Sequence, residues 1–136
     1  MHNPYVGVFA AALAAWIFGA IWYGVLGRTW MAAQGMGAAE IEAKRQVRQM
    51  PKGPMAISFV SELVMALVMS WLLAGLGVVD LMGGALTGLA LGVGFMAPAT
   101  LVNNTFPGRK PMLSVIDGAH WIIVAMIEGV VLVLLS

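Results

Sequence analysis

Three ionisable residues fall within one apolar stretch near the end of the sequence. The stretch SVIDGAHWIIVAMIE, residues 114–128, contains Asp117, His120 and Glu128. In a helix, Asp117 and Glu128 point in directions about 20° apart, and His120 lies within about 60° of them. A charged side chain costs roughly 3 kcal/mol at the centre of a bilayer on insertion scales. We therefore expect these groups to face protein or water, where two carboxylates and an imidazole can carry protons or cations.

The composition indicates a membrane protein rather than a soluble one. Of the 136 residues, 61% are hydrophobic and only 10% are charged, whereas a soluble domain has roughly 25% charged residues. The net charge of +1 and the lack of a basic stripe argue against nucleic acid as a partner. The sequence has no cysteine, which excludes disulfides, thiolate metal sites and cysteine nucleophiles. Because so few residues are charged, the lipid bilayer is the expected partner of the chain.

Four apolar stretches are long enough to cross a bilayer, which takes about 20 residues of helix. They cover residues of about 4–27, 55–76, 81–104 and 112–135. The polar segment 28–54 follows the first stretch, and its part AAEIEAKRQVRQM, residues 38–50, predicts a short helix on the membrane surface. The predicted fold is an all-α integral membrane bundle of four transmembrane helices plus this interfacial helix in the first cytoplasmic loop. We expect a single domain over residues 1–136.

The basic residues predict the orientation of the four spans. All seven lie in the connections after the first and third spans, and these are Arg28, Lys44, Arg45, Arg48, Lys52, Arg109 and Lys110. Because cytoplasmic loops carry the excess of Lys and Arg, both connections are expected in the cytoplasm. Both ends of the chain are then expected on the outer face.

Counting 1.5 Å of rise per residue from the cytoplasmic ends of the spans predicts one polar cluster. Glu62 in the second span and Asp117 with His120 in the fourth all come out at a depth of about 10 Å. The predicted members of the cluster are Tyr23, Glu62, Asn103, Asn104, Asp117 and His120. Glu128 is expected about 16 Å further along its helix than Asp117, with no charged partner at its depth.

The third span carries a ladder of small residues. Gly84, Gly88 and Gly92 recur every fourth position, a pattern that lets another helix approach closely. The ladder is expected to pack against the first span of the same chain, or alternatively against a second copy in a homodimer. Pro98 has no N–H to donate, which frees the carbonyl of Gly94 and predicts a kink.

Three interpretations of the polar cluster compete. In the structural one, the polar groups bond one another and hold four helices in register. In the second, the carboxylates and His120 titrate as a site for protons or cations, with Glu128 as an outer relay. In the third, Asp117 and His120 lie one turn apart and bind a metal ion with Glu62, a weak signal on which we do not base a metal or cofactor assignment.

No catalytic motif is found in the sequence. It contains no GxSxG elbow, HExxH pair, P-loop or dinucleotide fingerprint. We therefore expect no enzyme activity. The leading hypothesis is a transporter for protons, cations or a small solute. The alternative is an accessory or assembly subunit of a larger membrane complex with a structural polar core.

Residues 19–31, GAIWYGVLGRTWM, resemble the opening of a family of small four-span bacterial membrane proteins catalogued as domain of unknown function 1761. The spacing of Trp22 and Tyr23 to Trp30 and Met31 carries the resemblance most specifically. Later segments are similar at Ala97–Pro98, near Asn103, at Gly108–Arg109 and at the pair Asp117 and His120. The resemblance implies a four-helix integral membrane fold in a bacterial cytoplasmic membrane, and it implies no activity.

Overall fold

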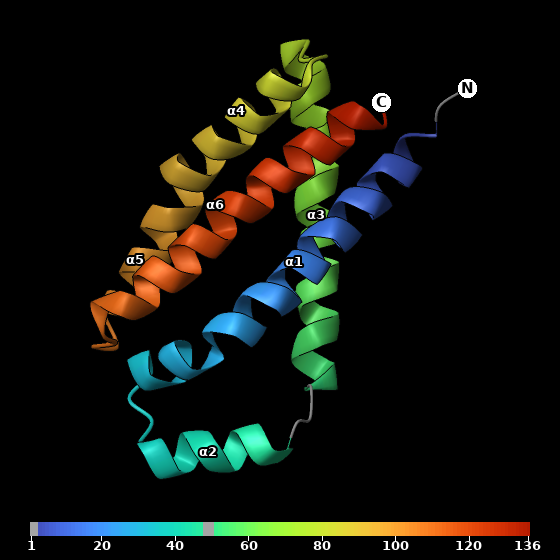
Figure 1. The fold of residues 1–136 in the computed structure, drawn as a ribbon. Coiled ribbons are helices and arrows are strands. Elements are labelled where there is room, and N and C mark those ends of the chain that lie inside the picture. Colours follow the sequence, from blue (N-terminus) through green and yellow to red (C-terminus); the bar gives the residue numbers. More distant parts are fainter. Residues whose placement is uncertain (1–2, 48–50) are drawn as a thin grey trace.

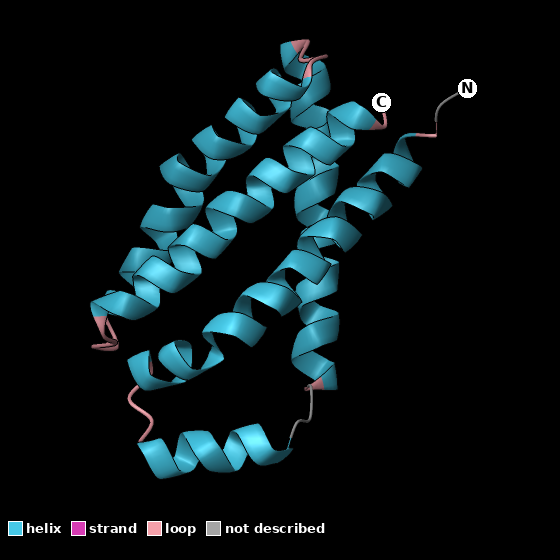
Figure 2. Ribbon diagram, viewed as in Figure 1, coloured by secondary structure: helices cyan, strands magenta, loops and turns pink. Residues whose placement is uncertain are grey.

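The computed structural model describes residues 3–47 and 51–136 of the chain. The elements are α1 (Pro4–Ala33), α2 (Ala38–Val47), α3 (Lys52–Leu76), α4 (Leu81–Leu91), η1 (Gly92–Met96), α5 (Ala97–Thr105) and α6 (Pro111–Leu134). The described residues form helices and connections and contain no strand, as Figure 2 shows, so the all-α prediction is confirmed. Four helices are long and apolar enough to cross a membrane, and the third of them runs through α4, η1 and α5 from Leu81 to Thr105.

The first membrane helix is longer than predicted. It ends at Ala33 rather than near residue 27, because the next residue with a helix-breaking conformation is Gly35, at a φ of 93°. The short helix predicted in the connection after the first span is present as α2, which has no buried residue. Arg48 and the rest of its predicted last turn, residues 48–50, lie outside the described residues.

Helix α6 lies at the centre of the bundle. In Figure 1 it runs between α1 on one side and α4 with α5 on the other, while α3 crosses behind α1 and α6. Helix α2 lies across the end of the bundle at which α1 and α3 diverge. The connection between α5 and α6 lies at this same end, so the structure brings the two basic loops together on one side.

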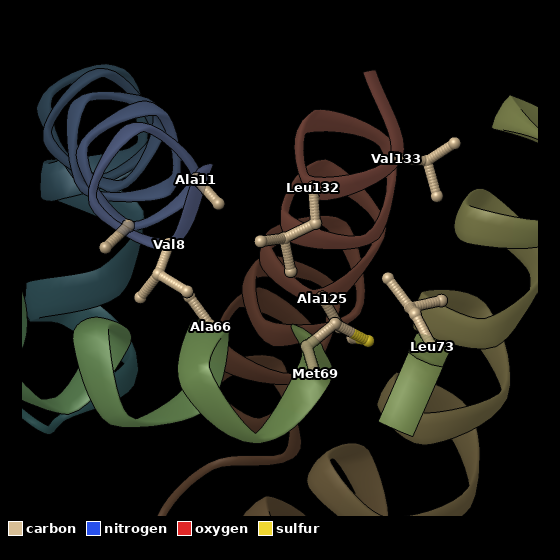
Figure 3. Close-up of a cluster of buried hydrophobic side chains, with 9 residues drawn as sticks. Val8, Ala11, Ala66, Met69, Leu73, Ala125, Leu132 and Val133 are labelled. Atoms are coloured by element: carbon tan, nitrogen blue, oxygen red, sulfur yellow. The ribbon is translucent and has the colours of Figure 1, made fainter. Parts of the chain in front are cut away.

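Small side chains allow α1, α3 and α6 to pack closely. Ala11, Ala12 and Ala66 have no exposed surface, and they join Met69 and Ala125 in the buried apolar core, part of which Figure 3 shows. Dispersion contacts of this kind, rather than the exclusion of water, hold helices together within a membrane. Large apolar side chains on the outer faces, such as those exposed along α3, remain available to lipid.

The glycine ladder packs against α6, and not against the first span or a second copy as predicted. A Cβ added to Gly84 would lie 2.5 Å from the carbonyl oxygen of Gly129, and one added to Gly88 would meet the backbone of Ala125. Helix α1 makes no contact with α4. The spacing of the glycines showed that one face of the third span carries only small residues, but not which helix would pack against that face. Helix α6 packs there and places its own Gly129 against Gly84.

We expect Gly88→Ala to destabilise the protein by about 3 kcal/mol, because its new methyl group collides with backbone atoms that cannot move aside. Gly94→Ala is the matched control in the same span, since a Cβ there meets nothing within 4 Å. The midpoint of unfolding in detergent measures both changes. Equal midpoints for the two variants would show that the close α4–α6 approach does not hold the fold.

The break predicted at Pro98 takes the form of a π-helical turn over Gly92–Met96. The N–H of Ala97 donates to the carbonyl of Gly92, five residues earlier. This wider turn precedes the proline and accommodates a residue that cannot donate a backbone hydrogen bond.

Candidate functional site

Asp117 is the hydrogen-bonded centre of the first polar group. The hydroxyl of Tyr23 donates to its Oδ1 at 2.7 Å, and the indole N–H of Trp30 donates to the same oxygen at 3.1 Å. One residue before Tyr23 in α1, the indole N–H of Trp22 donates to the backbone carbonyl of Ile116 at 3.1 Å. Three aromatic side chains of α1 therefore hold this end of α6, and the predicted association of Tyr23 with Asp117 is observed.

The sequence did not assign a role at the site to Trp22 or Trp30. The first span was expected to end near residue 27, before Trp30. Tyr23 and Trp30 are seven positions apart, which is close to two helical turns and places them on one face of a longer helix. That spacing is the signal that would have identified the pair.

His120 lies among aromatic rings on the next turn of α6. Only 4% of its surface is exposed. Its ring stacks on Phe18 at a centroid distance of 5.9 Å and lies 4.9 Å from the ring of Tyr23. Gly19 makes room for it, because a Cβ there would lie 3.0 Å from His120 Nε2. The buried Nδ1 has no hydrogen-bond partner among the described residues.

Glu62 and Glu128 form a second polar group, apart from Asp117. Each is 1% exposed, and their charges lie close enough to interact. Glu62 Oε2 and Glu128 Oε1 have no hydrogen-bond partner among the described residues. The prediction that Glu128 has no charged partner is therefore wrong, because Glu62 lies within electrostatic range of it.

The depth count failed for Glu62 for two geometric reasons. Helix α3 begins at Lys52 rather than near residue 55, which moves Glu62 about 4.5 Å further along the helix. In addition, α3 crosses α6 at an angle (Figure 1), whereas the count treated the spans as parallel. Glu62, near the middle of α3, therefore lies nearer to Glu128 than the depth count predicted.

The two asparagines do not join either group. Asn103 is exposed, and the Nδ2 atom of Asn104 is buried without a partner among the described residues. Both lie on α5, which contacts α6 and η1 but neither α1 nor α3. Helix α6 lies between α5 and α1 (Figure 1). The two amides and Tyr23 are therefore on opposite sides of α6, although all were predicted at a similar depth.

A cavity of about 530 Å³ opens where α1 and α3 diverge. Its walls come from α1, from the start of α3 and from one turn of α6, and the residues that line it are Trp16, Gly19, Ala20, Tyr23, Gly24, Gly27, Trp30, Met31, Pro51, Pro54, Met55, Ser58, His120 and Trp121. The indole N–H of Trp16 donates to the carbonyl of Met55 at 3.1 Å and joins α1 to α3 at the cavity wall. The sequence did not predict this cavity, because it depends on the angle between the two helices.

The described residues contain no group of three or more His, Cys, Asp or Glu side chains that could hold a metal ion. Asp117 and His120 are one turn apart on α6, but Glu62, the predicted third ligand, does not form such a group with them. The arrangement therefore offers two different chemical environments, a carboxylate pair in the core and an aromatic cavity beside a hydrogen-bonded aspartate.

The model of one protein family matches nearly the whole chain. This family, described as Protein of unknown function (DUF1761), matches residues 6–133. The chain therefore belongs to this family, as the resemblance in its first span and later segments predicted. Neither a curated protein nor a solved structure matches the chain significantly.

Proposed function

We propose that this member of the DUF1761 family is a small transporter that moves protons or other cations, with or for a small solute, and that Glu62 and Glu128 form its ion site. The observation that carries the proposal is the burial of both carboxylates at 1% exposure, each with an oxygen that has no partner among the described residues. The proposal involves no catalytic step, because transport requires a change of protonation or ion occupancy and no covalent reaction.

A purely structural role explains this pair poorly. Buried polar groups that hold helices together normally satisfy one another's hydrogen bonds, because an unpaired group in a low-dielectric interior is costly. Asp117 meets that expectation, since one of its oxygens accepts from both Tyr23 and Trp30. Two buried carboxylates within electrostatic range of each other repel when both are charged, so an added proton or a bound cation stabilises them.

The aromatic cavity gives the proposed transporter a place for its solute. It lies at the end of the bundle that carries the two basic loops. By the positive-inside rule this end faces the cytoplasm, and both ends of the chain face outward in the cytoplasmic membrane of a bacterium.

We expect single cysteines to report this orientation directly, because the natural chain has none. In intact cells, a membrane-impermeant maleimide should label Ser136→Cys and should label Lys44→Cys only after the membrane is opened. The reverse pattern would overturn the orientation without affecting the fold.

The proposal is tested by proton flux into proteoliposomes that contain the purified protein and an internal pH indicator dye. A pH gradient should collapse faster than in protein-free vesicles, and replacing Glu62 and Glu128 should remove the difference. Flux at the protein-free rate for the natural chain, with and without candidate solutes and alkali cations, would count against the proposal.

A second candidate is an accessory subunit of a larger membrane complex, and the hydrogen bonds of Asp117 favour it. These bonds from Tyr23 and Trp30 hold α1 on α6. Polar residues with such a structural role are what the accessory function predicts. Stable co-purification with one larger partner in mild detergent would support this role, and a monomer or homodimer by native mass spectrometry would oppose it.

A further inference from the structure

Four large aromatic side chains line the cavity between α1, α3 and α6. Trp16, Tyr23 and Trp30 come from α1, and Trp121 comes from α6. The volume of about 530 Å³ falls within the range of about 300–1,000 Å³ that is typical of sites for small molecules. Aromatic faces are negatively polarised, and they attract cations within about 6 Å of the ring centre.

The charges around the cavity favour a cation further. The residues that line it in the described part of the chain include no Lys, Arg, Asp or Glu. The nearest carboxylate joined to its wall is Asp117, which accepts hydrogen bonds from Tyr23 and Trp30. Hydrogen bonds to an anion polarise the donor rings toward more negative charge, so Asp117 strengthens the attraction of these two faces for a cation.

The remaining lining argues against a hydrated metal ion or an anion. Met31 and Met55 add polarisable apolar surface, and carboxylate ligands for a hard cation are lacking among the described lining residues. An anion would find no Lys or Arg in that lining, and its imidazole, His120, is only 4% exposed. Lys52 near the entrance is exposed, so water and salt screen its charge.

We propose that this cavity binds an apolar organic cation, such as a quaternary ammonium, a phosphonium or an aromatic amine. Trp16, Tyr23, Trp30 and Trp121 supply the cation–π faces, and Asp117 supplies the negative charge behind two of them. This inference deepens the proposed function, since it names the class of solute, but binding itself requires neither translocation nor the Glu62–Glu128 pair.

Tetraphenylphosphonium and tetraphenylborate provide a matched test, because they have nearly the same shape and opposite charge. Equilibrium dialysis against empty micelles of the same detergent corrects for partition into detergent. We expect the purified protein to bind the cation at least about tenfold more tightly than the anion or the neutral triphenylphosphine oxide. Equal binding of all three would identify an unselective apolar pocket, such as one for an acyl chain, and would overturn the proposal.

Three substitutions connect the binding to these residues. Trp121→Ala should weaken cation binding about tenfold, and Trp121→Phe should restore part of it because a ring face remains. Asp117→Asn keeps an acceptor oxygen for Tyr23 and Trp30 but removes the charge, so cation binding should fall severalfold while the neutral ligand is unaffected. Trp71→Ala is the control for loss of an indole, since Trp71 is 75% exposed on the outer face of α3. Cation affinity that is insensitive to both Trp121 variants and to Asp117→Asn would place the site elsewhere.

The double variant Glu62→Gln and Glu128→Gln separates this inference from the transport proposal. We expect it to bind tetraphenylphosphonium as the natural protein does, because neither glutamate lines the cavity. If the cation still binds but no variant shows flux, the cation site is supported and the transport proposal is contradicted. If flux is observed without selective cation binding, the transport proposal is supported and the cation site is contradicted.

Discussion

Replacing Glu62 and Glu128 together by glutamine is expected to lower proton or cation flux in proteoliposomes about tenfold or more, an increase in barrier of about 1.4 kcal/mol or more. Glutamine keeps the size of the side chain and its capacity for hydrogen bonding, but it cannot release a proton or carry a negative charge. Both carboxylates are 1% exposed, so solvent cannot substitute for them at that point of the path. Each single variant should also be impaired, because an ion held by two carboxylates is bound more weakly by one.

The same double substitution should leave the free energy of unfolding unchanged or slightly increased. The natural carboxylates have oxygens without a partner among the described residues, and an unpaired ionisable group in a membrane interior opposes folding. Thermal unfolding in detergent measures this, and Glu40→Gln in α2 is the control, because Glu40 is exposed. A large loss of stability with normal flux would reverse both expectations and would make the pair structural.

The fold was predictable because each span is specified locally. Length and hydropathy determine that a stretch crosses the bilayer, Gly35 with its positive φ follows the end of α1, and Pro51 is the N-cap of α3. The ends themselves were less predictable. The extension of α1 to Ala33 depends on residues with no strong preference for or against a helix. This extension places Trp30 within hydrogen-bonding distance of Asp117.

The candidate site was predicted only in part, because helix crossing angles are absent from a depth count. The contact of Tyr23 with Asp117 follows from equal depth on two neighbouring helices. The pairing of Glu62 with Glu128 does not, since it depends on the oblique course of α3 across α6. Sequence spacing gives the face of a helix and its depth, but the neighbour that covers each face follows from packing of the whole bundle.

The aromatic cavity is a second consequence of that oblique course. Contacts between α3 and α6 bury Met69 and Ala125 in the apolar core, whereas Pro51 and Pro54 at the start of α3 remain exposed. Since straight helices that cross must diverge on both sides of the crossing, the space that opens between α1 and the start of α3 has to be filled by large side chains or left open. Trp16 and Phe59 fill it near the crossing with rings 5.7 Å apart, and beyond Trp16 it stays open as the cavity.

Asp117→Ala is expected to destabilise the protein by about 3 kcal/mol, the second large effect that the structure predicts. The substitution removes the acceptor of two hydrogen bonds and leaves the hydroxyl of Tyr23 and the indole N–H of Trp30 unpaired in a partly buried site. Each unsatisfied donor costs about 1–3 kcal/mol, which is more than the net value of the bond it had made. The midpoint of unfolding in detergent measures the loss.

The graded series at this position separates the hydrogen bonds from the charge. Asp117→Asn retains an acceptor oxygen in the same place, so it should lose less than half as much stability as Asp117→Ala. Tyr23→Phe removes one donor and one bond together and should cost only about 1 kcal/mol, because no buried group is left without a partner on α1. If Asp117→Asn is instead as damaging as Asp117→Ala, the charge of Asp117 rather than its two hydrogen bonds holds α1 on α6.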